Sequence, residues 1–174
     1  MHFNPYGGVA AHIAVDLVNQ APAAADAVTR VLHEHGYKPL PPVTPAQADD
    51  LNRWVERLRP VFDDRVDLGA RVELLNALLA AAAARPYISQ HDDRPPHLHF
   101  ADERADVVAR VRAYTAAGLA HVLCDDPQRL GRCHRDGCHV VFVDTSRNGR
   151  RRFCSARCSN RVHVADHRKR AAVR

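Results

Sequence analysis

Four cysteines in the last quarter of the chain constrain its fold more than any other feature. Cys133 and Cys138 are separated by four residues, fifteen residues follow, and Cys154 and Cys158 are separated by three. Two close pairs at this separation are typical of a tetrahedral four-thiolate site, in which each pair comes from one short turn and the segment between them folds back. The spacing therefore predicts one zinc ion. Because four thiolates leave no open coordination position, we expect a structural ion.

Other uses of these cysteines fit the sequence less well. Disulfides need an oxidising compartment, and the N-terminal segment MHFNPYGGVAAH lacks the basic flank and apolar centre of an export signal. Free thiols would not explain the paired spacing, and an iron–sulfur cluster is an unusual neighbour for so many arginines. The nearby histidines that could replace a cysteine ligand are His134, His139, His163 and His167.

The segment between the two cysteine pairs has the composition of a hairpin. Val140 to Asp144 is rich in β-branched and aromatic residues, and Asn148-Gly149 is a strong turn signal. Arg150 to Phe153 would then return as the second strand. Ser155 to Arg170 has the pattern of a helix, on which the second cysteine pair would share a face. These elements predict a small treble-clef or zinc-ribbon-like finger.

Charge divides the chain just before the cysteine pairs. Residues 1–128 hold 12 Lys and Arg against 17 Asp and Glu, a net charge of −5, whereas residues 129–174 hold 13 against 3, a net charge of +10. We therefore expect two modules, 1–128 and 129–174, with different partners. Nearly all the basic residues are arginines, which favour bidentate contacts with phosphates and base edges, although a GC-rich genome would give the same bias.

The charge of the finger predicts nucleic-acid binding. A small metal-stabilised module with a net charge near +10 is an electrostatic match for a phosphate backbone. The alternative is that its arginines only solvate a surface or pair with the acidic body. The predicted nucleic-acid contacts are Arg147, Arg150, Arg151, Arg152, Arg157, Asn160, Arg161, Arg168, Lys169 and Arg170.

Residues 1–128 predict a mostly helical body with a short β-hairpin, so the fold class of the whole chain is α+β. Residues 13–20 fit either a strand or the first turns of a helix. Two extended segments, 87–91 and 97–101, are joined by DDRPP and predict the hairpin. The amphipathic helical patterns cover residues 23–35, 45–61, 67–84 and 102–124.

Some polar residues of the body could form a ligand or metal site. His97 and His99 alternate along one face of an extended segment, with His91 just before it, and Asp16 and Asn19 interrupt an apolar run. The alternative is that the histidines are solvated or bonded to neighbouring acids, because no close carboxylate completes a metal triad. Asp16 and Asn19 would then simply cap and tie the first helix.

Nothing in the sequence predicts an enzyme, since it has no glycine-rich phosphate loop and no nucleophile elbow. The fifth cysteine, Cys124, is followed by two aspartates, which disfavour a reactive thiolate, so we expect a core residue. No apolar run approaches the ~18 residues that a membrane span requires. We expect a cytoplasmic protein that does not bind a membrane.

The cysteine-bearing tail resembles the zinc finger of the CGNR family. The matching features are the paired cysteines, the core FVDTSRNGRRRFCS, and the sequence Cys158-Ser159-Asn160-Arg161, in which serine replaces the family's glycine. The body is more loosely similar to the ABATE domain that accompanies this finger, through AVDLVNQ, RLRPVF and HDDRPPHLHF. The resemblance implies a bacterial regulator of stress-induced transcription, with a DNA-binding finger and a sensor-like body.

We therefore expect a zinc-dependent, DNA-binding transcription regulator whose body binds a small-molecule effector or forms a homodimer. RNA binding by the same finger is one alternative, although the tail offers only Phe142 and Phe153 for base stacking. Another alternative is a small-ligand pocket in the body, lined by His91, His97 or Asp16, with the finger as a protein-docking module.

Overall fold

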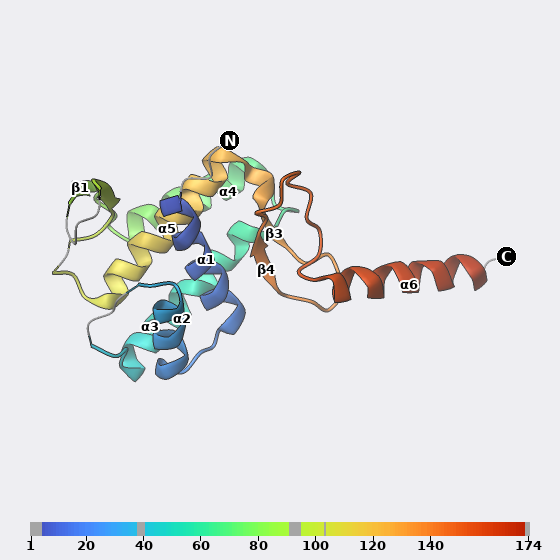
Figure 1. Ribbon diagram of the computed structural model, residues 1–174, viewed down its shortest axis with the longest axis horizontal. Coiled ribbons are helices and arrows are strands. Elements are labelled where there is room, and N and C mark those ends of the chain that lie inside the picture. Colours follow the sequence, from blue (N-terminus) through green and yellow to red (C-terminus); the bar gives the residue numbers. More distant parts are fainter. Residues whose placement is uncertain (1–4, 38–40, 91–94, 103, 173–174) are drawn as a thin grey trace.

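The computed structural model describes residues 5–37, 41–90, 95–102 and 104–172. These residues form α-helices, two short 3₁₀ helices and two antiparallel pairs of strands (Figure 1). In chain order the elements are α1 (Pro5–Gln20), α2 (Ala25–Glu34), α3 (Pro45–Leu58), η1 (Arg59–Phe62), α4 (Leu68–Ala81), β1 (Tyr87–Ser89), β2 (His97–His99), α5 (Val107–Asp125), η2 (Pro127–Arg129), β3 (Leu130–Arg132), β4 (Val141–Val143) and α6 (Ala156–Ala172).

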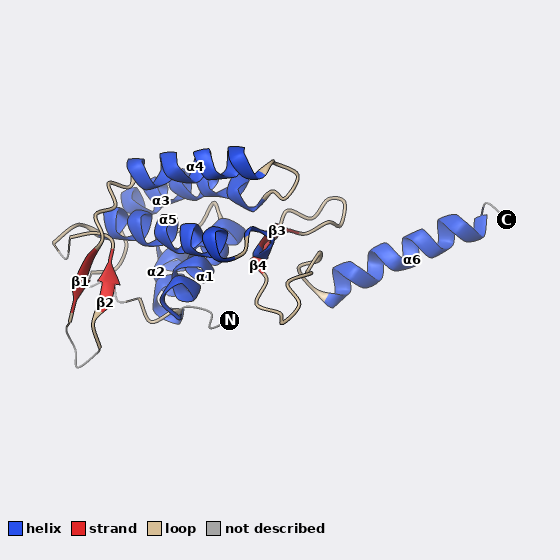
Figure 2. Ribbon diagram, turned by 90° about the horizontal axis from the view of Figure 1, so that it is seen from above, coloured by secondary structure: helices blue, strands red, loops and turns tan. Residues whose placement is uncertain are grey.

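Helices α1 to α5 form the body, and α1 and α5 cross at its centre (Figure 2). Residues 13–20, which fitted a strand or a helix, are helical. The side chains of this part of α1 are buried around most of the helix, as expected of a helix in the middle of a bundle. The crossing is close because α5 carries Gly118, where a Cβ atom would lie 2.4 Å from the Cβ of Ala10.

Side-chain caps fix the starts of α3, α4 and α5. Thr44 and Gln47 form a reciprocal capping box at the start of α3, and the Asp67 side chain accepts a hydrogen bond from Ala70 N at the start of α4. Helix α5 begins at Val107 rather than at residue 102, because the Asp106 side chain caps it there. The apolar stripe predicted for α4 is only partly buried, since Val72 is exposed.

The predicted hairpin of the body is confirmed: β1 pairs with β2, and Ile88 lies opposite Leu98. The hairpin predicted between the cysteine pairs is wrong. Strand β4 pairs with β3, and Arg150 to Phe153 form no strand. The reason is burial, because β4 and Leu130 of β3 enter the hydrophobic core of the body, where a strand of consecutive arginines could not be buried.

A side-chain amide of the body holds the β3–β4 pair. The Nδ2 of Asn19, at the end of α1, donates to the Val141 carbonyl at 2.9 Å, and Val141 N donates to Oδ1 of Asn19 at 2.8 Å. The amide therefore pairs with β4 as a neighbouring strand would. These bonds connect the last turn of α1 directly to the strand that leads away from the cysteine turn.

A buried arginine ties three segments together at the same junction. Arg71 of α4 is 5% exposed, and its Nε donates to the Val61 carbonyl at 2.9 Å. Its Nη2 donates to the carbonyls of Pro127 and Leu130 at 3.2 and 3.3 Å. Burial lowers the pKa of this guanidinium from its usual value. Arg71 therefore joins η1, η2 and β3.

Helix α6 extends away from the body, whereas β3 and β4 pack against it (Figures 1 and 2). Its described side chains are exposed apart from Cys158, Ser159 and Val162. The division of the chain at residues 128 and 129 stays a prediction, although part of the second segment shares the core of the first. Among the described helices, none combines the length and apolarity required to cross a membrane.

Candidate metal centre

The first cysteine pair sits on the turn between β3 and β4. Cys133 follows β3, its N–H donates to the Val140 carbonyl at 2.9 Å, and Cys138 N donates to the Arg135 carbonyl at 3.0 Å. Gly137 has φ +72°, a left-handed conformation that L side chains rarely adopt. The glycine allows a tight turn that brings the two thiols to the same side.

The second cysteine pair lies at the start of α6. Cys154 precedes the helix and Cys158 lies in its first turn, so only one of the two is helical, contrary to the prediction that both share a helix face. The Ser155 hydroxyl accepts a hydrogen bond from Cys158 N at 3.3 Å and caps the helix. The second pair therefore lies at the N-terminus of α6, where the helix dipole favours negative charge.

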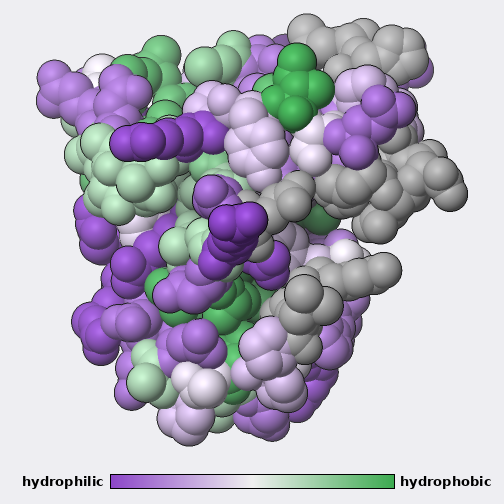
Figure 3. All heavy atoms as spheres, turned by 90° about the vertical axis from the view of Figure 1, so that its left-hand side faces the viewer, coloured by the Kyte–Doolittle hydropathy of each residue, from purple (hydrophilic) through white to green (hydrophobic). Residues whose placement is uncertain are grey.

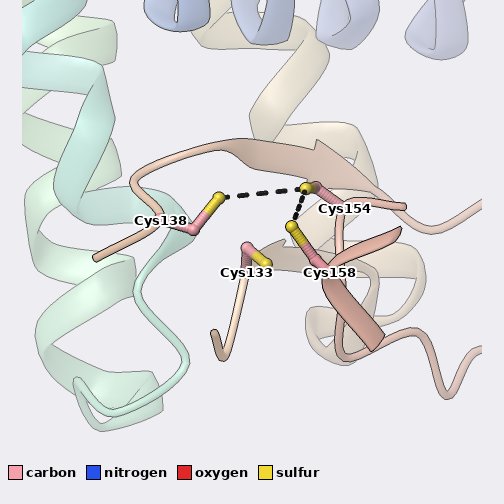
Figure 4. A group of neighbouring side chains, drawn as sticks. All are labelled: Cys133, Cys138, Cys154 and Cys158. Atoms are coloured by element: carbon pink, nitrogen blue, oxygen red, sulfur yellow. Dashed lines mark hydrogen bonds between the residues drawn. The ribbon is translucent and has the colours of Figure 1, made fainter. Parts of the chain in front are cut away.

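The four thiols meet at one point, as the spacing predicts (Figure 4). All four Sγ atoms lie within 4.8 Å of one another, with 3.9 Å between Cys138 and Cys154 and 3.5 Å between Cys154 and Cys158. With zinc–sulfur bonds of about 2.3 Å, the edges of a tetrahedral site are about 3.8 Å long. The quartet therefore fits one zinc ion with small adjustments.

The surroundings of the quartet favour the thiolate form at Cys158 and disfavour it at Cys154. Hydrogen bonds from the Cys154 thiol, Ser155 and Arg135 lower the pKa of Cys158 to about 6, and Arg135 Nε lies 3.2 Å from its sulfur. Burial raises the pKa of Cys154 to about 12. Four adjacent thiols do not lose their protons together unless a cation compensates the charge, so we expect zinc binding to release protons and to weaken in acid.

Histidine is not needed to complete the site. Among the described residues, the metal-binding group at this place consists of the four cysteines. His134, next to Cys133, has its Nε2 2.6 Å from an Asp64 oxygen of the body and accepts a bond from Arg152 Nε at 3.3 Å on Nδ1. It therefore links the cysteine turn to the body.

The loop after β4 is organised by Asp144, which the sequence analysis missed. Its side chain is fully buried and accepts hydrogen bonds from the N–H groups of Ser146 and Arg151, both at 2.8 Å. Burial raises its pKa, but hydrogen bonds from the side chain and backbone of Ser146 and the backbone of Arg151, together with the Arg129 charge, outweigh burial and leave the pKa lowered. An acid directly after an apolar strand and before a turn was the signal that could have identified it. Asp144 fixes the loop that carries Arg147 and Arg150.

Replacing Asp144 with alanine should cost about 2 kcal/mol of unfolding free energy, because two buried N–H groups would lose a charged acceptor. Denaturant unfolding of the zinc-loaded protein measures this change. Asp49→Ala is the matched control, since it removes the same charge from an exposed position. Equal stability of both variants would contradict the role given to Asp144.

The predicted nucleic-acid contacts all have exposed side chains, and Arg151 and Arg152 also have structural roles. The Arg151 guanidinium lies 4.4 Å from the centroid of the Phe142 ring and donates to the carbonyls of Phe153, at 3.0 Å, and Cys154. Arg152 donates to His134. These two arginines support the loop and the cysteine turn.

A shallow open groove runs along one face of α6, which we call the α6 face. The residues that line the groove are spaced three, four and seven positions apart, so they form a continuous stripe on the helix. Lys169 and Arg170 are not among them. The lining residues are Arg157, Asn160, Arg161, Val164, Ala165 and Arg168.

The structure does not bring the predicted pocket residues of the body together. Asp16 lies 2.7 Å from Nε2 of His35, and Asn19 is bonded to β4. His97 and His99 form a separate group on β2, and His91 lies outside the described residues.

The remaining cysteine also departs from expectation. Cys124 was predicted to be a core residue, but it lies near the end of α5 with its side chain exposed. The neighbouring residues of the helix, Val122 and Leu123, take the buried positions instead.

Comparison with known proteins agrees with the geometry of the quartet. Residues 129–171 match the family model described as the CGNR zinc finger, and this segment runs from the end of η2 into the last turn of α6. A search of curated proteins found no match to the chain. The matched segment contains all four converging cysteines. Residues 129–171 are therefore similar to the CGNR zinc finger, and their cysteines can bind one zinc ion.

Proposed function

We propose that the finger binds duplex DNA, that zinc has a structural role in it, and that the protein regulates transcription. The observation that carries the proposal is the position of α6. It starts at the metal centre and extends into solvent, with three arginines on its α6 face (Figure 1). A quartet of thiolates fills the coordination of zinc, so the ion holds the helix in place rather than reacting with a substrate.

The dimensions and side chains of α6 suit the major groove of DNA. A helix of 17 residues is about 25 Å long, and the major groove admits one α-helix. Arginine pairs with guanine, asparagine pairs with adenine, and small apolar side chains contact the methyl group of thymine. The α6 face offers all three kinds of group through Arg161, Asn160 and Ala165.

The loop held by Asp144 supplies further positive charge. Arg147 and Arg150 are exposed there, on a backbone that the Asp144 carboxylate and the Arg129 guanidinium hold from inside. Exposed arginines on a fixed loop suit contacts with phosphates, which position a protein on DNA without reading its sequence.

Duplex DNA fits the finger better than single-stranded RNA, which is bound largely by stacking of bases on aromatic rings. Phe142 is 4% exposed and lies under the Arg151 guanidinium. Phe153 is half-buried, and its ring lies edge to face with His134 and His163, at centroid distances of 6.5 and 6.2 Å. Both phenylalanines of the finger are therefore already in contact with other side chains.

In this proposal, residues 1–128 form an ABATE-like body that binds an effector or a second copy of the chain, without catalysing a reaction. The rigid junction supports this division of roles. Asn19 joins α1 to β4, and Arg71 joins α4 to β3, so a change in the body would reach the finger through direct contacts.

The proposal is tested by fluorescence anisotropy of a labelled 20-base-pair duplex with zinc-loaded protein, at 50 to 200 mM salt. We expect the affinity to fall steeply with salt. The double substitution Arg157→Ala and Arg161→Ala should weaken binding about 10- to 100-fold. Arg30→Ala, an exposed arginine of the body, is the control and should leave binding unchanged.

Two outcomes would contradict the proposal. Zinc-loaded protein that binds neither duplex DNA nor single-stranded RNA would exclude a nucleic-acid role for the finger. Stronger competition by single-stranded RNA than by unlabelled duplex would favour the RNA alternative.

A further inference from the structure

Two histidines of β2 point their ring nitrogens at one another, far along the chain from the cysteine quartet. His97 and His99 are two residues apart on a strand, so their side chains project from the same face of the hairpin. The Nε2 atoms of the two rings are 3.0 Å apart. The adjacent strand places Tyr87 opposite His99.

The outer nitrogen of each ring has an oxygen partner. Nδ1 of His97 lies 2.9 Å from the Pro95 carbonyl, which can only accept, so the proton of neutral His97 sits on Nδ1 and its Nε2 holds a lone pair. Nδ1 of His99 lies 3.3 Å from the Tyr87 hydroxyl, which can accept as well as donate. When His99 donates from Nδ1 to Tyr87, its Nε2 also holds a lone pair.

Two lone pairs at this separation repel unless a proton lies between the nitrogens or a metal ion to one side of them binds both. At metal–nitrogen distances of 2.0–2.1 Å, two histidine nitrogens on one ion are about 2.9 Å apart at a right angle and about 3.3 Å apart at the tetrahedral angle. The observed 3.0 Å falls between these values. Backbone carbonyls and other oxygens that hold the outer nitrogens are the usual second partners of metal-bound histidine.

We propose that His97 and His99 form a second metal site, which binds one divalent transition-metal ion through both Nε2 atoms, with Pro95 and Tyr87 orienting the rings. Imidazole ligands suit nickel, copper and zinc. Among the described residues these two histidines are the proposed ligands, and water or a small anion can occupy further coordination positions. When the ion binds, the proton of neutral His99 moves from Nε2 to Nδ1, where the Tyr87 hydroxyl accepts its hydrogen bond. We expect this binding to be weaker than binding by the four thiolates.

The other face of the hairpin does not offer a competing explanation. Ile88 and Leu98 are 74% and 43% exposed, and they project away from the histidines because side chains alternate along a strand. Figure 3 views the molecule from the side on which this hairpin lies in Figure 1. The hydrophobic residues there lie among hydrophilic ones rather than forming one continuous apolar surface.

The experiment is a nickel titration of the full chain with its finger already saturated by zinc, followed by calorimetry and by NMR of the histidine rings. We expect one saturable nickel site per chain, with the signals of His97 and His99 affected first. His97→Ala and His99→Ala should each weaken binding at least ten-fold. Tyr87→Phe keeps the ring of the strand but loses the hydroxyl, and should weaken binding about ten-fold.

His33→Ala is the control, because it removes an exposed histidine elsewhere and should leave nickel binding unchanged. The zinc content of every variant should stay the same, which separates this site from the finger. The dispersion of amide signals in α5 shows that the variants remain folded. Nickel binding that is unsaturable, or that is as strong in His97→Ala and His99→Ala as in the unaltered chain, would overturn the proposal.

Discussion

Replacing Cys133 with serine will unfold the loop after β4 and the start of α6 and abolish DNA binding, while α1 to α5 remain folded. The reason is the size of the contribution that the metal makes. A structural zinc site contributes roughly 10 kcal/mol or more to folding. The cysteine cluster otherwise consists only of the four thiols and Phe153, which is too small to fold by hydrophobic burial alone.

The body has a separate and much larger core, so the loss should stay local. Ile13, Leu32, Trp54 and Leu119 are among its fully buried side chains. Limited proteolysis and amide dispersion by NMR measure the effect, with cleavage expected between residues 144 and 172. Cys124→Ser is the matched control, because it removes a thiol that lies outside the quartet. A Cys133→Ser protein with a protease-resistant α6 would contradict the prediction.

Replacing Arg71 with methionine will destabilise the whole chain by about 3–5 kcal/mol. Methionine fills much of the same space but leaves the carbonyls of Val61, Pro127 and Leu130 without their donor. Unpaired buried acceptors cost more than the net value of the lost hydrogen bonds. Arg71→Lys should recover only part of the stability, since an ammonium group is a compact point charge that cannot present the rigid fork of donors.

Denaturant unfolding measures this loss, and hydrogen exchange at Leu130 and Val141 locates it at the junction. Arg30→Met is the control, because Arg30 is mostly exposed and pairs with Asp26 of its own helix. We expect that control to change stability by less than about 0.5 kcal/mol. An Arg71→Met protein as stable as the control would show that burying the guanidinium costs as much as its three bonds contribute.

The features that the sequence predicts best are local. The cysteine pairs are close in the chain, and each pair comes from one turn, so their spacing alone indicates the quartet. The cap at the start of α3 joins Thr44 to Gln47, which is only three residues away. The β1–β2 hairpin likewise joins neighbouring segments. Short-range geometry is encoded in residue type and spacing, which a single sequence displays.

The features that could not be predicted depend on distant partners. Asn19 meets Val141 across 122 positions, and Arg71 meets Leu130 across 59. The turn at Asn148-Gly149 is real, as the φ of +61° at Gly149 shows, and it led to the wrong prediction of a hairpin at that place. The arginines that follow the turn cannot enter the core, so they do not form the second strand. Strand β4 pairs instead with Leu130 to Arg132, because Leu130 can be buried in the core of the body.

The histidines of the body show the same limit. Their alternation on one strand was visible in the sequence, but Pro95 and Tyr87, which orient the rings, could be identified only from the structure.

The most direct test of the zinc finger is the metal content of the full chain, purified without added metal and measured by elemental analysis. We expect one zinc per chain in the unaltered protein, retained on dialysis, and its loss in Cys158→Ser. A chain that carries no zinc and binds none when zinc is supplied would contradict this expectation.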